Sequence, residues 1–88
     1  MRPVAEVWAE FHPAYDAGDY VGVVERGRSS LEASGYATPL YNLACCEAFT
    51  GQTGEAIEHL RVAFERRPSL REIARDDSDL DPLRSERA

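Results

Sequence analysis

The chain has 88 residues, a formal net charge of −6 and an isoelectric point near 4.8, which fits one small acidic domain. Its basic residues are interleaved with Glu and Asp and form no basic stripe, so we expect no nucleic-acid binding. No apolar run approaches the ~20 residues that a membrane span needs. No apolar signal core follows the charged N-terminus, so we predict a cytoplasmic protein without membrane contact.

The first predicted element carries an apolar stripe at spacings of three and four residues. An interior proline removes a helix hydrogen bond and clashes with the preceding turn. Pro13 lies inside the stripe, and we therefore expect a kink or a break around residues 9–12. Trp8 and Phe11 belong to the stripe, as core residues or as anchors of an interface. The stripe consists of Val4, Val7, Trp8, Phe11 and Tyr15.

The second helix is predicted from about Tyr20 to Glu32, with Asp19 as its N-cap. A Ser34-Gly35 pair should close it, because glycine accepts the left-handed conformation that ends many helices. Apolar and small residues at helical spacing form the expected buried face, which comprises Tyr20, Val23, Val24, Gly27 and Leu31.

Two further helices are predicted on either side of Gly51. Thr38 is the expected N-cap of the third helix, with Pro39 at its first position, and Thr53 is the expected N-cap of the fourth. The fourth helix should end near Arg67, before Pro68. A capping box from Ser69 to Glu72 predicts a short fifth helix that ends at about Arg75.

An acidic, irregular segment follows the fifth helix. Leu80 and Leu83 are expected to hold it against the domain, which should comprise residues 1–83, and residues 84–88 should fray.

The segment from Leu40 to Pro68 resembles the tetratricopeptide (TPR) repeat family in residue type and spacing. Leu40, Leu43 and Ala44 fill its opening apolar and small positions, and Gly51 fills its turn position. The later positions are matched by Glu55-Ala56, Leu60, Ala63 and Pro68, whereas Glu47 stands where an aromatic residue is usual. Gly18-Asp19-Tyr20 resembles the family's inter-helix turn, so the first half is similar to a divergent repeat.

The resemblance implies an all-α fold of two stacked antiparallel helical hairpins with a short C-terminal capping helix. Small residues such as Ala44, Ala56 and Ala63 should then lie where the helices touch. The family's concave groove is lined by the first helix of each repeat. The resemblance therefore implies a partner-binding groove, with Glu47 at its rim, that is lined by Thr38, Tyr41, Asn42, Cys45, Ala48 and Phe49.

The residues that could carry chemistry do not form a recognised site. Cys45 and Cys46 are adjacent and cannot both chelate a metal ion comfortably, so we expect Cys46 to pack in the core and Cys45 to face the groove. The aspartates from Asp77 to Asp81 lack the glycine and the final glutamate of a calcium loop. His12 and His59 have no spaced Ser or Cys partner, and we expect His59 at the surface. We therefore predict no catalytic residue, metal or cofactor.

Taken together, the pattern predicts a non-catalytic protein–protein interaction module that binds a peptide or helix of another protein in a shallow groove. Two repeats make little surface, which favours a homo-oligomer with aromatic residues buried between chains. A purely structural homo-oligomerisation element is one alternative. A small enzyme or accessory subunit is another, although the sequence shows no convergent polar pocket.

Overall fold

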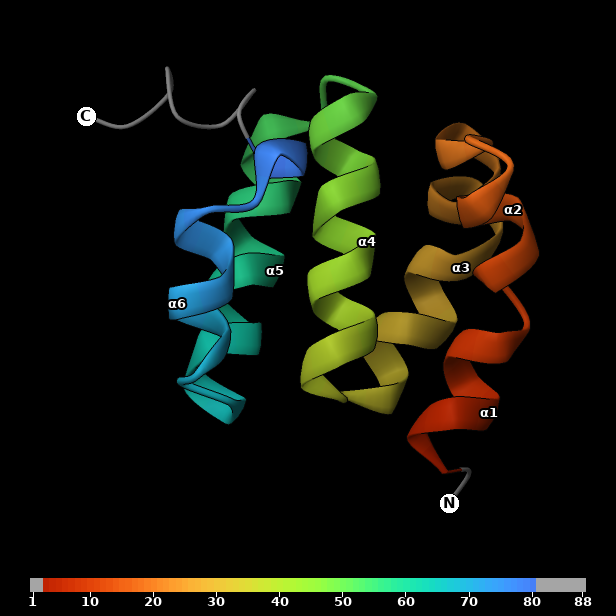
Figure 1. The fold of residues 1–88 in the computed structure, drawn as a ribbon. Helices are drawn as coiled ribbons and strands as arrows, with labels where there is room; N and C mark the ends of the chain where they lie inside the picture. Colours follow the sequence, from red (N-terminus) through yellow and green to blue (C-terminus); the bar gives the residue numbers. More distant parts are fainter. Residues whose placement is uncertain (1–2, 81–88) are drawn as a thin grey trace.

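The computed structural model describes residues 3–80, and this part of the chain is helical, which confirms the predicted all-α class (Figure 1). The three long helices run antiparallel to one another in sequence order. None of the described helices is long and apolar enough to cross a bilayer. The elements are α1 (Val4–Ala9), α2 (His12–Asp16), α3 (Tyr20–Ser34), α4 (Ala37–Phe49), α5 (Thr53–Arg66), α6 (Leu70–Arg75) and the 3-10 turn η1 (Ser78–Leu80).

The first apolar stripe is divided into two short helices, as Pro13 predicts. α1 ends at Ala9, and α2 begins with Pro13 inside its first turn, where the missing N–H needs no partner. Phe11 lies at the break and is 3% exposed. A Cβ at Gly27 would come within 3.2 Å of its ring, so Gly27 allows α3 to pack closely on Phe11. The break therefore turns Phe11 into the core, and its predicted role at an interface is wrong.

Both ends of α3 form as predicted, although the helix continues two residues beyond Glu32. The Asp19 carboxylate accepts a hydrogen bond of 3.0 Å from the Gly22 N–H and caps the first turn. Gly35 follows the last turn at φ 68°, a conformation that glycine adopts without strain.

The predicted threonine caps are wrong. α4 begins at Ala37, so Thr38 lies within its first turn and accepts a hydrogen bond from the Arg67 guanidinium at 3.2 Å instead. Thr53 is the first residue of α5 and follows Gln52. Ser69 does precede α6, but its own backbone is helical and its side chain makes no cap bond. A capping residue needs a non-helical backbone conformation, which residue type alone does not provide.

α4 is the central helix of the fold. Nine of its thirteen residues are buried, because α1, α3, α5 and η1 all pack against it. Ala44, Ala56 and Ala63 are fully buried, which confirms that small residues occupy the close contact between α4 and α5. Leu80 is also buried, as predicted, whereas Leu83 and residues 84–88 lie outside the described part of the chain.

Candidate functional site

The six residues predicted to line the groove all lie on α4, but only Phe49 is exposed, and Ala48 is 4% exposed. Tyr41 and Cys45 are 6% and 1% exposed, and Phe49 is 42% exposed. Thr38 and Asn42 are half-buried. The described structure therefore has no open groove along α4. The prediction that the Cys45 thiol faces a groove is wrong.

The C-terminal segment of the chain covers the middle of the predicted groove. The Tyr41 hydroxyl donates a hydrogen bond of 2.6 Å to Oδ2 of Asp77. η1 packs on α4, and Leu80 is only 4% exposed. The sequence predicted that Leu80 would hold this segment down, but it did not predict that the segment would rest on Tyr41.

Four aromatic rings form a continuous row from α1 to the end of α4. Trp8 contacts Tyr15 edge-on at 5.4 Å between ring centroids, and Tyr15 contacts Tyr20 in the same way at 5.7 Å. Tyr20 stacks on Phe49 at 4.5 Å with the planes 15° apart. The first three rings are half-buried, and Phe49 is exposed. We call these residues, Trp8, Tyr15, Tyr20 and Phe49, the aromatic row.

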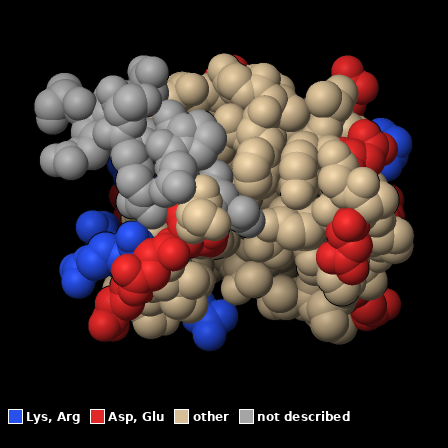
Figure 2. All heavy atoms as spheres, turned by 45° about the horizontal axis from the view of Figure 1, so that its top comes forward, with Lys and Arg blue, Asp and Glu red and all other residues tan. Residues whose placement is uncertain are grey.

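The surface around the end of α4 is almost free of charge. Figure 2 turns the upper ends of α2 and α4 forward and shows a broad uncharged area there. Charged side chains lie at its two sides, mostly acidic at the end formed by α1 and α2. Aromatic rings on an uncharged face are typical of a protein-binding surface.

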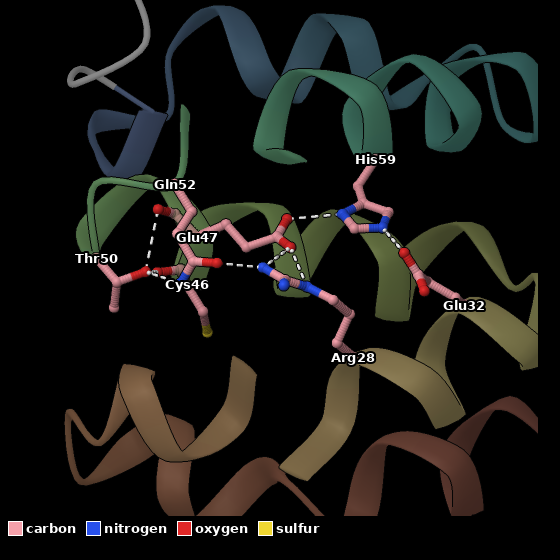
Figure 3. Close-up of polar contacts among 7 residues, drawn as sticks. All are labelled: Arg28, Glu32, Cys46, Glu47, Thr50, Gln52 and His59. Atoms are coloured by element: carbon pink, nitrogen blue, oxygen red, sulfur yellow. Dashed lines mark hydrogen bonds and ion pairs between the residues drawn. The ribbon is translucent and has the colours of Figure 1, made fainter. Parts of the chain in front are cut away.

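A second polar site lies inside the helix bundle, around Glu47 and His59 (Figure 3). Glu47 is 0% exposed, although the sequence placed it at a rim, and His59 is 8% exposed, although the sequence placed it at the surface. His59 Nδ1 lies 2.7 Å from Glu47 Oε1, and His59 Nε2 lies 2.6 Å from Glu32 Oε2. Both predictions are wrong because these two polar side chains neutralise each other within the core.

Arg28 completes this arrangement from α3. Its Nε donates to Glu47 Oε2 at 3.0 Å, and its Nη2 lies 2.9 Å from the same oxygen. Nη2 also donates to the side-chain oxygen of Gln52, which follows α4. The charge cluster, which we define as Arg28, Glu32, Glu47 and His59, therefore joins α3, α4 and α5.

The two carboxylates favour the protonated form of His59. The hydrogen bond to Glu47 is the main cause that raises the pKa of His59 above its ordinary 6.5, and Glu32 adds to it, while burial acts in the opposite direction. The protonated ring donates from both nitrogens, which leaves neither available to take a proton from a substrate. No group of three or more metal-binding side chains occurs among the described residues. The cluster joins α3, α4 and α5 through paired charges.

The spacing of Glu47 and His59 along the sequence indicates that both lie on buried helix faces, although their residue types favour the surface. His59 follows Ala56 by three positions and precedes Ala63 by four, so it lies on the buried face of α5. Glu47 likewise follows Leu43 and Ala44 at helical spacing. Two opposite charges at core positions of adjacent helices are a sign of a buried pair.

Comparisons with known protein families, with curated proteins and with solved structures found no match to this chain.

Proposed function

We propose that this chain is a cytoplasmic, non-catalytic protein–protein interaction module with a TPR-like arrangement of helices, and that the aromatic row is its docking surface. One observation carries the proposal: the ring of Phe49, the last residue of α4, is exposed and stacked on Tyr20. Stacked aromatic residues offer a large apolar contact whose side chains are already ordered, so binding costs them little conformational entropy.

Other features of the described residues support an interaction module over an enzyme. The charge cluster has both nitrogens of His59 engaged, and Arg28 and Glu47 are engaged with each other. Two antiparallel helices in contact through Ala44, Ala56 and Ala63 are what the TPR resemblance implies.

Site-specific photo-cross-linking in cells tests this proposal. A photoreactive phenylalanine analogue at position 49 should give a covalent adduct of defined mass. The same analogue at Val21, which is 53% exposed on α3, should give none. Replacing Tyr20 by Ala in the position-49 protein should reduce the yield, because Tyr20 orders the ring at that position. Equal yields at the two positions, or no adduct at position 49, would contradict the proposal.

A further inference from the structure

We infer that the α4 face around Tyr41 is a docking site for a partner segment that presents a carboxylate three residues before a leucine, and that the chain's own C-terminal segment occupies this site as an autoinhibitory strap. The strap comprises α6, η1 and the two residues between them, Asp76 and Asp77. Tyr41 does not belong to the aromatic row, so the inference goes beyond the proposed function and concerns a second surface.

The strap reaches α4 through a carboxylate and a leucine that lie three residues apart. Figure 1 shows α6 running alongside α5 and η1 turning in to α4. The Tyr41 hydroxyl donates a hydrogen bond of 2.6 Å to Oδ2 of Asp77, and Leu80 is 4% exposed. The Leu80 N–H donates to the Asp77 carbonyl oxygen at 3.1 Å, which closes a 3-10 turn. Residues three apart lie on the same side of such a turn, so both side chains face α4.

The α4 face matches this pair of side chains. Tyr41 is 6% exposed and places a hydroxyl among the buried, mostly apolar residues of α4. A buried phenol needs a hydrogen-bond acceptor, and a carboxylate is a strong one for an O–H donor. A leucine beside it removes apolar surface from water. The face is therefore suited to an Asp-x-x-Leu turn, whichever chain supplies the turn.

The strap is anchored more lightly than the helix that it covers. Among its described side chains only Leu70 and Leu80 are buried, whereas nine of the thirteen residues of α4 are buried. Segments with few buried contacts open locally while the rest of a protein stays folded. The strap can therefore leave the α4 face without the unfolding of α3, α4 and α5.

A tethered strap reduces the affinity of the face for a free segment. Its effective concentration is in the millimolar range, because the chain holds it close to its site. The apparent affinity for a partner segment is lowered by the fraction of molecules whose strap is open. Loosening the strap should therefore strengthen the binding of a partner segment, which is the behaviour of an autoinhibitory contact.

A peptide added to the full chain tests the inference. The probe is a synthetic peptide with the sequence of residues 74–80 and uncharged ends, and the control peptide has serine in place of its leucine. The NMR signals of α4 report binding as the peptide is raised into the millimolar range. Leu80→Ser, which removes the buried end of the strap, should bind the probe at least about tenfold more tightly than the unmodified protein does. The control peptide should bind neither protein.

Ile73→Ser on the exposed side of α6 is the matched control and should bind the probe as the unmodified protein does. Circular dichroism checks the helix content, and Asp77→Asn loosens the strap in a second way that keeps the buried leucine. Tyr41→Phe, added to Leu80→Ser, should weaken the binding of the probe because it removes the hydroxyl donor.

Equal affinities of the unmodified and Leu80→Ser proteins for the probe, or no binding by either loosened variant, would overturn the inference. Self-association of the unmodified protein that Leu80→Ser abolishes would assign the face to the strap of a second copy, and would overturn the assignment to a partner segment.

Discussion

Glu47 shows how a single residue can hold three helices together. A carboxylate without exposure to water is costly unless other groups neutralise it and satisfy its oxygens. Here Arg28 from α3 bonds one oxygen and His59 from α5 bonds the other, so the burial of Glu47 depends on the placement of both neighbouring helices. Glu47 is also the position at which the sequence departs from the TPR family, where an aromatic residue is usual.

Removing the charge of Glu47 should therefore destabilise the domain strongly. Glu47→Gln keeps the shape of the side chain but leaves Arg28 and His59 without their shared anion, and we expect a loss of about 3 kcal/mol in the free energy of unfolding. Glu58→Gln removes a carboxylate from the exposed pair with Arg61 and should cost less than about 1 kcal/mol. Urea denaturation measures both values, and equal losses would show that the cluster contributes no more than a surface pair.

His59 should make the stability of the domain depend on pH. The ring binds its proton more tightly in the folded protein than in the unfolded chain, where its pKa is near 6.5. The stabilisation is therefore complete below pH 6.5 and is lost as the pH rises through the raised pKa of the folded state.

The measurement is the free energy of unfolding from about pH 5.5 to about pH 9, compared between the unmodified protein and His59→Gln. The difference between the two proteins should shrink as the pH rises. A difference that stays constant or grows with pH would contradict the proposed protonation of His59.

Among the elements, α4 organises the molecule because helices and turns surround it. Its contact with α5 relies on alanines that leave no room for a larger side chain. Its other side is covered by α1 and by the C-terminal segment, which explains why a helix expected to line an open groove is buried along most of its length.

Overpacking the contact between α4 and α5 should lower stability. Ala56→Leu adds volume at a site without exposed surface and should cost about 1–3 kcal/mol. Glu58→Leu, two positions along the same helix and exposed, should change the melting temperature little. Thermal unfolding followed by circular dichroism compares the two variants. A similar loss in both would contradict the assignment of the buried face of α5.

The elements that local rules determine were predictable from the sequence. Pro13 marked the break between α1 and α2, Asp19 marked the start of α3, and the alanines marked the face between α4 and α5. The burial of Cys45 and Tyr41 was not predictable, because it results from α1 and η1, which approach α4 from distant parts of the chain. The burial of His59 was missed because a titratable residue was assigned to the surface by type, although its spacing placed it with Ala56 and Ala63.

On the scale of the whole molecule, the main feature is the difference between its two ends. The α1–α2 end carries Trp8 and Tyr15 of the aromatic row, whereas residues 53–75 combine five arginines and four glutamates with the exposed Ile57 and Ile73. A small domain buries only part of its apolar surface, and stacking of copies end to end would bury more of it, as neighbouring units do in repeat proteins. Association of this kind depends on protein concentration.

Sedimentation equilibrium of the unmodified protein and of Phe49→Glu over a range of protein concentrations tests most directly whether copies of the chain associate through the aromatic row, as the sequence predicts. For the unmodified protein we predict a weight-average mass above the 9.8 kDa of one chain that rises with protein concentration, and for Phe49→Glu a mass of one chain. A mass of 9.8 kDa for the unmodified protein at every protein concentration would contradict the account.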